Sequence, residues 1–354
     1  MRRRLRGRWG NMQLELQNIG MIKEAKVNID GLTVIAGEND TGKSTVGKAL
    51  YYKKTVQKSY EEFLKSREKN KRKSKSEISS AIIPQLQMQT IIHEALEGVE
   101  AVFQYDFQEK IFYFQLDENA QIKIKDKKNR NTIFIDTPIL ANFFDFFSML
   151  DTVQNEIEYE VNNYPYLSRS LFKQLRLKLK TETTLDKYSM LETLKEIIGG
   201  ELKTDSMGKL VFVKNDGSTH NVNAVATGIK NFGILQLLLK NNYLTKDAIL
   251  IVDEPEVHLH PKWQLKYAQF VVNLVQNGVK VFINSHSPYM IEALQRYSEK
   301  ANVPSDFYLA QDGYIAKVED SNSQTLARIF EKLSEPFDVF EEMEAESMES
   351  LLNG

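Results

Sequence analysis

Cysteine is absent from this chain of 354 residues, and tryptophan is rare, with only two residues. The lack of cysteine excludes disulfides and thiolate metal sites, which is typical of proteins in a reducing cytoplasm. No uninterrupted apolar run approaches the ~20 residues that a membrane-spanning helix needs. The basic start, MRRRLRGRWGNM, lacks the apolar core of a secretory signal. We therefore expect a cytoplasmic protein without a membrane partner.

A dominant charge of one sign is also missing, because the net charge is only −2, yet the charges are unevenly placed. Residues 65–75 carry seven basic residues and one acidic residue. Such a run is typical of a solvated loop, or of a contact with nucleic acid or an acidic partner. Residues 331–354 carry eight acidic residues and one lysine, together with Phe337, Val339 and Phe340. This tail is either a solvated end or a docking segment.

The hydrophobic pattern predicts an α/β fold. Before residue 139, strands alternate or are wholly apolar, and they are predicted at 12–20, 31–37, 101–108, 110–117, 121–125 and 131–136. A helix is expected from Ser44 to about Glu68. After a hairpin at 209–222, the apolar strands in DAILIVDEP and VKVFINSHSP are each followed by a helix, and FYLAQ and YIAKV close the sheet.

We predict four consecutive parts along the chain. Residues 12–138 and 204–330 form the two halves of one head, and residues 139–203, where apolar residues follow helical spacing, form an inserted helical lobe. Residues 331–354 are the acidic tail. The basic segment before Met12 precedes the first predicted strand, and Met12 is a candidate for the natural initiator.

The stretch GENDTGKST follows the apolar strand LTVIA and precedes a predicted helix. A glycine-rich loop in this position wraps backbone N–H groups around a phosphate, and the helix N-terminus adds its positive dipole. Lys43 is expected to bridge the β- and γ-phosphates, and the Ser44 hydroxyl to ligate Mg²⁺. The residues expected to surround the phosphates are Gly37, Glu38, Asn39, Asp40, Thr41, Gly42, Lys43, Ser44 and Thr45. The sequence therefore predicts a nucleotide-binding site.

A second element is ILIVDEPEVHLHP, an apolar strand that ends in Asp253 and Glu254. Acids at the carboxyl end of a strand lie where open α/β sheets bind their ligands. We expect Asp253 to hold Mg²⁺ and Glu254 to orient or deprotonate the attacking water. An alternative is that Glu256, His258 and His260, at alternate positions, ligate a metal such as zinc.

The third element, FINSHSP, ends another predicted strand with polar residues and His286. An isolated histidine is most often a surface or capping residue. Because this histidine follows the acidic pair by one strand–helix unit, we expect it to hydrogen-bond the γ-phosphate or the attacking water.

In this order, the motifs resemble those of ABC-type ATPases of the SMC, RecF and OLD group, and DEPEVHLHP and NSHSP are similar to the single-domain bacterial members. The resemblance extends from about Gln13 to Tyr314. It implies an ABC-type P-loop head with a mixed sheet and an inserted helical lobe. Lys43, Glu254 and His286 would be catalytic, and ATP and Mg²⁺ the cofactors.

The group's signature motif is represented by AVATGIKNFGIL, where Ala226 stands in place of the usual serine. By resemblance, Thr227 and Gly228 would contact the γ-phosphate of a second subunit, with the Thr227 hydroxyl replacing that of the serine. The glutamine of the group's Q-loop is not identifiable, and residues 132–140 are the expected place for this loop.

The resemblance implies a homodimer or higher oligomer that ATP closes and hydrolysis opens. One reading is a sensor ATPase that controls an effector encoded by a neighbouring gene, as in anti-phage defence. The alternative is a RecF-like or SMC-like repair ATPase that binds DNA through residues 65–75 and the lobe. A transporter ATPase is a third reading, which the atypical signature and the HLHP loop disfavour.

Overall fold

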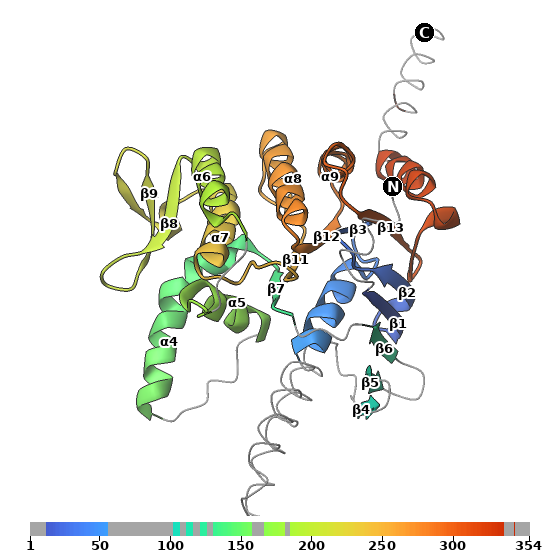
Figure 1. The fold of residues 1–354 in the computed structure, drawn as a ribbon, viewed down its shortest axis with the longest axis horizontal. Helices are drawn as coiled ribbons and strands as arrows, with labels where there is room; N and C mark the ends of the chain where they lie inside the picture. The colour runs from blue at the N-terminus through green and yellow to red at the C-terminus, as the bar shows by residue number, and fades with distance from the viewer. Residues whose placement is uncertain are drawn as a thin grey trace, which may run out of the picture.

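The computed structural model describes residues 12–55, 102–106, 111–115, 121–125, 130–157, 166–180, 185–335 and 343. Residues 1–11, the basic run 65–75 and most of the acidic tail lie outside them, together with the predicted helix beyond residue 55. Figure 1 shows a central sheet with helices on both faces and a small second sheet at one end. In this view α4 and α5 lie below α6 and α7.

The described strands of the large sheet number eleven, in the order β4-β5-β6-β1-β2-β14-β13-β3-β12-β11-β7. Their bounds are β1 Gln13–Ile19, β2 Ile22–Asn28, β3 Leu32–Ala36, β4 Val102–Asp106, β5 Ile111–Gln115, β6 Gln121–Lys125, β7 Thr132–Ile135, β11 Ile249–Asp253, β12 Lys280–Ser285, β13 Ser305–Gln311 and β14 Tyr314–Ala316. β13, β3, β12, β11 and β7 are mutually parallel, whereas the strands from β4 to β2 are antiparallel. The sheet is therefore mixed, as predicted.

The second sheet has the order β10-β9-β8 among the described strands, with β8 Gly200–Thr204, β9 Leu210–Lys214 and β10 Thr219–Asn221. β9 and β10 form the predicted hairpin, and Gly217 in its turn has a φ of 86°. β8 was not predicted, because residues 200–203 were assigned to the helical lobe. The preceding helix ends at Gly199, which has a left-handed φ of 70° and so releases the chain into a strand.

Helices cover the large sheet on both faces. Their bounds are α4 Phe144–Ile157, α5 Tyr166–Arg176, α6 Lys187–Ile198, α7 Thr227–Lys240, α8 Pro261–Gln276 and α9 Pro288–Lys300, with 3-10 turns η2 Pro138–Phe143, η3 Val222–Ala224 and η4 Val318–Asp320. Residues 43–55 and 322–335 are also helical. No described helix is long and apolar enough to cross a membrane.

Alternation along the central strands explains why both faces are covered. Ile249 and Ile251 of β11 pack in one core cluster with the helix at 43–55, whereas Leu250 and Val252 pack in the other with α7, α8 and α9. Each of these four side chains is at most 1% exposed. Because successive side chains point to opposite faces, a wholly apolar strand requires helices on both.

Most predicted elements are confirmed. Among them are β3, which precedes the predicted phosphate loop (residues 37–45), β11, which leads into the acidic pair, and β12, which precedes His286. β2 was not predicted; it pairs with β1, and its buried residues Ile22, Ala25 and Val27 are interrupted by charged ones. α7 begins at Thr227, and the predicted helix from about Pro261 to Asn277 is α8.

Candidate functional site

Four parallel strands end together at one edge of the large sheet, and the predicted site residues follow them. The register pairs Ala36 of β3 with Ser285 of β12, and Asp253 of β11 with Asn284 of β12. β7 lies on the other side of β11. The phosphate loop, the acidic pair and the segment that contains His286 are thus adjacent, although residues 37 and 286 are far apart in sequence.

The loop between β3 and the helix at residue 43 requires glycine at two positions. Gly37 has a φ of 157°, and a Cβ there would lie 2.5 Å from the carbonyl oxygen of Ala310. Gly42 has a φ of 83°, and a Cβ there would lie 2.8 Å from Ile22. Asp40 also takes a left-handed φ, of 62°. These turns let the backbone curve tightly before the helix begins, as a phosphate-binding loop does.

Lys43 lies at the start of that helix and is 4% exposed. Its Nζ donates a hydrogen bond to the carbonyl oxygen of Glu38, so the side chain folds back over the loop. Burial lowers the pKa of Lys43, while the nearby carboxylates of Glu254, Asp253 and Glu256 oppose that shift. A buried ammonium group at the mouth of a phosphate loop is suited to an anionic ligand.

Ser44 and Asp253 join the loop to the acidic strand. The Ser44 Oγ donates to Asp253 Oδ1 over 3.0 Å, and Asn284 Nδ2 donates to the same oxygen over 2.8 Å. The Oδ1 atom of Asn284 is buried and accepts no hydrogen bond from the residues that the structure describes. Burial raises the pKa of Asp253, and the two donated hydrogen bonds oppose the shift. A hydroxyl, a carboxylate and an unpaired amide oxygen are hard oxygen ligands, which fit Mg²⁺.

Glu254 and His286 face each other across the ends of β11 and β12. The backbone N–H of Glu254 donates to the carbonyl oxygen of Asn284 over 3.0 Å, and Glu254 takes a left-handed φ of 46°. His286 Nδ1 lies 3.3 Å from Glu254 Oε1. The side chains of His286 and Glu254 are 40% and 32% exposed. Both groups are thus reachable by a ligand and close enough to act together.

Glu256 is the buried acid of the same loop, 5% exposed. Its Oε1 accepts hydrogen bonds from the Ser285 hydroxyl and from the backbone N–H groups of His286 and Ser287. Burial raises the pKa of Glu256, and these donors oppose the shift. Sequence reasoning assigned Glu256 only to the alternative metal site and gave Asn284 no role, because neither contact can be read from spacing alone.

The structure does not assemble the alternative metal site. The Glu256 carboxylate is directed to residues 285–287, and His260 Nδ1 caps α8 by accepting from the N–H of Lys262. His258 has a left-handed φ of 64°. Within the described residues, no group of three histidine, aspartate or glutamate side chains converges as a metal site requires.

Thr227 and Gly228 open α7. The helix cap, Ala226, makes no side-chain hydrogen bond, and a Cβ on Gly228 would lie 3.2 Å from Trp263. One turn later, Asn231 Nδ2 donates to the carbonyl oxygen of Pro255 over 3.4 Å, which places α7 against the loop after Glu254. No hydrogen bond among the described residues connects Thr227 or Gly228 to the phosphate loop. The segment 132–140 contains no glutamine; Asp136 follows β7 beside the end of β11.

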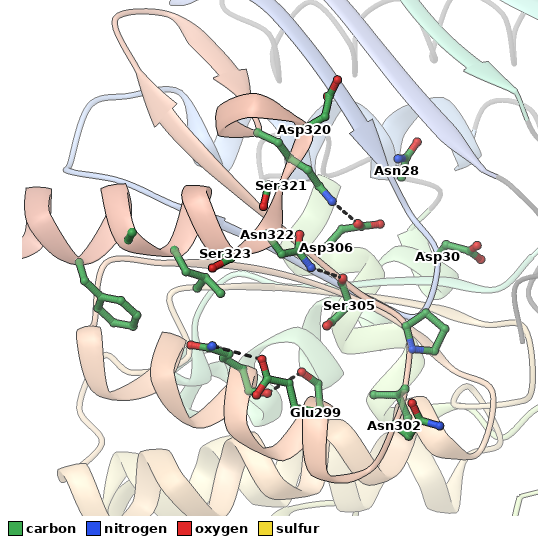
Figure 2. A pocket seen from close by; sticks show the side chains of 18 of the residues that line it. Asn28, Asp30, Glu299, Asn302, Ser305, Asp306, Asp320, Ser321, Asn322 and Ser323 are labelled. Carbon is green, nitrogen blue, oxygen red and sulfur yellow. Dashed lines mark hydrogen bonds and ion pairs between the residues drawn. The ribbon is translucent and has the colours of Figure 1, made fainter. Parts of the chain in front are cut away.

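A separate cavity of about 1040 Å³ lies at the opposite edge of the sheet. It is lined at the starts of β3 and β13 by Asp30, Ser305 and Asp306, and by Glu299 of α9 (Figure 2). Because the phosphate loop follows the other end of β3, this cavity is not part of the candidate site.

Comparisons with known proteins identify a family and several similar proteins. The sequence profile of the family described as AAA ATPase domain matches residues 51–291, roughly two thirds of the chain. This range includes the acidic pair and His286, and the phosphate loop precedes it. Septu protein PtuA of Bacillus thuringiensis is 23% identical over 320 residues, which cover 79% of this chain and 72% of that protein.

Among solved structures, an SMC head bound to the C-terminal winged-helix domain of ScpA is 13% identical, with a TM-score of 0.46. That match covers 86% of this chain and 96% of the other. The ADP conformation of an ATP-binding cassette of an ABC transporter is 14% identical, covers 93% and 96%, and has a TM-score of 0.40. On the match of the family profile, the chain belongs to the AAA ATPase domain family.

Proposed function

We propose that this chain is a Mg²⁺-dependent ATPase that dimerises on binding ATP and thereby controls a separately encoded effector in anti-phage defence. The observation that carries the proposal is the 3.0 Å hydrogen bond between Ser44 of the phosphate loop and Asp253 of the acidic strand. It joins two motifs that lie 209 residues apart, in the arrangement that phosphoryl-transfer sites use.

Nucleotide binding rests on the loop and its lysine. The curved backbone from Gly37 to Gly42 would surround the β-phosphate, and Lys43 would leave the Glu38 carbonyl to contact the β- and γ-phosphates. Ser44 and Asp253 would hold Mg²⁺, directly or through water. When bound, the metal supplies positive charge that offsets the charge of the phosphates.

Hydrolysis rests on Glu254 and His286. The Glu254 carboxylate is partly exposed beside Asp253, and it would orient or deprotonate the attacking water. His286 lies 3.3 Å from it and would hydrogen-bond the γ-phosphate or the same water. Lys43 would neutralise charge that develops on the phosphate in the transition state.

Dimerisation rests on the start of α7. Its cap residue leaves the first N–H groups of the helix without a side-chain acceptor, so this end of the helix can receive an anion. We assign Thr227 and Gly228 to the γ-phosphate held by a second copy of the chain. ATP would then close the dimer, and hydrolysis would open it.

The relation to Septu protein PtuA supports anti-phage defence as the setting. An effector encoded by a neighbouring gene would be the target of the opening and closing. The alternative function in DNA repair would use the basic run 65–75, which lies outside the described residues, together with the lobe.

The test uses Glu254→Gln, which keeps the size of the side chain and removes its charge. Light scattering of the purified protein is measured with and without Mg-ATP, beside the ATPase rate of the wild type. We expect Mg-ATP to convert Glu254→Gln from a species of 40.9 kDa to one of about twice that mass, and EDTA to reverse the change. The wild type should hydrolyse ATP.

Thr227→Val in the same background is the matched control, because it removes only the hydroxyl that replaces the signature serine. It should bind nucleotide and remain monomeric. A wild type that neither dimerises nor hydrolyses ATP would contradict the proposal and indicate that the head needs another protein to become an enzyme.

A further inference from the structure

Glu256 joins the loops that carry the two expected catalytic groups. It belongs to the loop between β11 and α8, two residues after Glu254, but all three hydrogen bonds to its Oε1 come from residues 285–287, between β12 and α9. The donors are the Ser285 hydroxyl at 2.8 Å, the His286 N–H at 2.8 Å and the Ser287 N–H at 3.2 Å. One buried carboxylate therefore fixes the backbone on which His286 is mounted.

A second set of hydrogen bonds, which involves α8 and α9, holds the same loop. The Ser287 hydroxyl donates to Gln264 Oε1 of α8 over 2.7 Å and accepts from the N–H of Met290, which caps α9. Gln264 Nε2 in turn donates to the carbonyl oxygen of Leu259 over 3.0 Å. These hydrogen bonds anchor Ser287, and the backbone N–H of the neighbouring His286 is held by Glu256.

The ring of His286 lies between two carboxylates. Its Nδ1 is 3.3 Å from Glu254 Oε1 and 3.5 Å from Glu256 Oε1. The Nδ1 atom is buried, whereas the side chain as a whole is 40% exposed, so the exposed part of the ring is the part away from Nδ1. In a neutral imidazole, a carboxylate beside Nδ1 favours the proton on that nitrogen and leaves Nε2 as an acceptor.

We propose that Glu256 is a positioning residue that aligns His286, holding its backbone and selecting the tautomer with the proton on Nδ1. This inference rests on the proposed function and assigns it one more residue. Without Glu256, Glu254 would be the only carboxylate left to the His286 Nδ1–H. Such a pairing would draw Glu254 away from the attacking water, so Glu256 would keep both groups available.

The first experiment is a double-mutant cycle with Glu256→Gln, His286→Ala and their combination. We expect Glu256→Gln to lower kcat about 10–100-fold, the usual range for residues that orient a ligand from behind. Nucleotide affinity, measured by calorimetry, should stay within about two-fold, because Glu256 has no place in the phosphate loop. In the His286→Ala background, Glu256→Gln should change kcat by less than about two-fold, because its effect passes through the histidine.

Gln236→Ala is the matched control for a purely structural role. Gln236 is 1% exposed and, like Glu256, uses its side chain to hold backbone groups, here Leu202 N–H and Gly200 carbonyl. It should lower thermal stability without changing kcat at temperatures where the protein is folded. Additive losses in the Glu256–His286 cycle, or a kcat of Glu256→Gln equal to that of the wild type, would overturn the proposal.

A second experiment needs no turnover. The ring nitrogens of histidine are recorded by ¹⁵N NMR at pH about 8.5, where an ordinary imidazole is neutral, and His286→Ala assigns one of the five histidines. We expect His286 to carry its proton on Nδ1 in the wild type and in Glu254→Gln, where the nearer carboxylate is removed. The preference should be lost when Glu256→Gln is added to Glu254→Gln. A proton on Nε2 in the wild type would overturn the inference even if the chain hydrolyses ATP. If hydrolysis is absent but the Nδ1 tautomer depends on Glu256, only the proposed function fails.

Discussion

Buried charged side chains have different partners at the two ends of the parallel strands. At the starts of the strands, Lys280 pairs with Asp30 over 2.9 Å, and Arg130 pairs with Asp247 over 2.9 Å. At the ends of the strands, Lys43 is also buried, but among the described residues the hydrogen bond of its Nζ goes to a carbonyl oxygen. The second carboxylate oxygen of Glu256 there has no hydrogen-bond partner within the described part of the chain.

This difference separates groups that hold the fold from groups prepared for a ligand. A buried charge costs several kcal/mol unless it is paired, so an uncompensated cluster persists only where the fold is stabilised elsewhere. At the starts of the strands the cavity wall also has an ion pair, between Asp306 and Lys317 (Figure 2). The difference supports the proposal that the loop at residues 37–45 binds the ligand.

The largest effect is expected from Lys280→Met at the starts of the strands. Lys280 is fully buried and also donates to the carbonyl oxygen of Ile29 over 3.0 Å. Its loss leaves Asp30, 7% exposed, without its ion-pair partner, which costs about 3–5 kcal/mol of folding free energy. Urea denaturation measures that loss, and nucleotide affinity of the folded fraction should not change.

The combination of Lys280→Met with Asp30→Asn tests the cause of that loss. It removes the unpaired charge and should recover most of the stability, because the penalty comes from Asp30 rather than from the absence of the lysine. If the double variant is as unstable as Lys280→Met alone, packing of the lysine stem, and not pairing, explains the effect.

Lys43→Met at the ends of the strands should show the reverse pattern. It removes a buried ammonium whose pKa is lowered by burial, so the thermal stability of the nucleotide-free protein should be unchanged or higher. The value of kcat/KM for ATP should fall about 10²–10³-fold, equal to about 3–4 kcal/mol of transition-state stabilisation. A Tm that drops as for Lys280→Met would show that Lys43 holds the fold.

The proximity of the predicted site residues could be expected from the sequence because each motif is local. Each motif directly follows an apolar strand, and parallel strands bring their carboxyl ends together whatever lies between them in the chain. The contacts of Glu256 and Asn284 were not predicted, because they depend on which of two neighbouring loops a side chain faces. The ion pairs at the starts of the strands were missed for the same reason: residues 30 and 280 are adjacent only through the register of β3 and β12.

Tyr267→Phe removes a hydroxyl group that is buried away from any ligand. The Tyr267 hydroxyl is fully buried near Glu256 and has no hydrogen-bond partner in the described ranges of the chain. Removing it should raise stability or leave it unchanged, within about 1–3 kcal/mol, without altering kcat. A loss of activity would mean that unpaired groups need no exposure to take part in function.

The same variant has a pH signature. Burial, with a smaller contribution from the charge of Glu256, raises the pKa of Tyr267 above its ordinary value of 10.0. A phenol that resists ionisation when folded has no effect on the pH dependence of stability below pH 10, and it reduces stability as pH rises further. Tyr267→Phe should therefore flatten the alkaline limb of Tm against pH, with the two proteins compared between about pH 8 and 11.

The smallest effect is expected from Arg296→Ala on α9, which separates pairing from burial. Arg296 pairs with Glu292 through a 2.9 Å hydrogen bond from Nε, but the side chains are 74% and 46% exposed. An exposed pair one helical turn apart contributes less than about 0.5 kcal/mol, and added salt should screen even that. The measurement is Tm in low and high salt, beside Lys280→Met.

If Arg296→Ala costs as much stability as Lys280→Met, the stabilisation comes from pairing itself. An unpaired charge at the phosphate loop would then no longer distinguish a ligand site from an ordinary surface. If the two differ by several kcal/mol, burial is what makes pairing necessary, and the buried Lys43, which forms no ion pair within 4.0 Å among the described residues, is then suited to an anionic ligand.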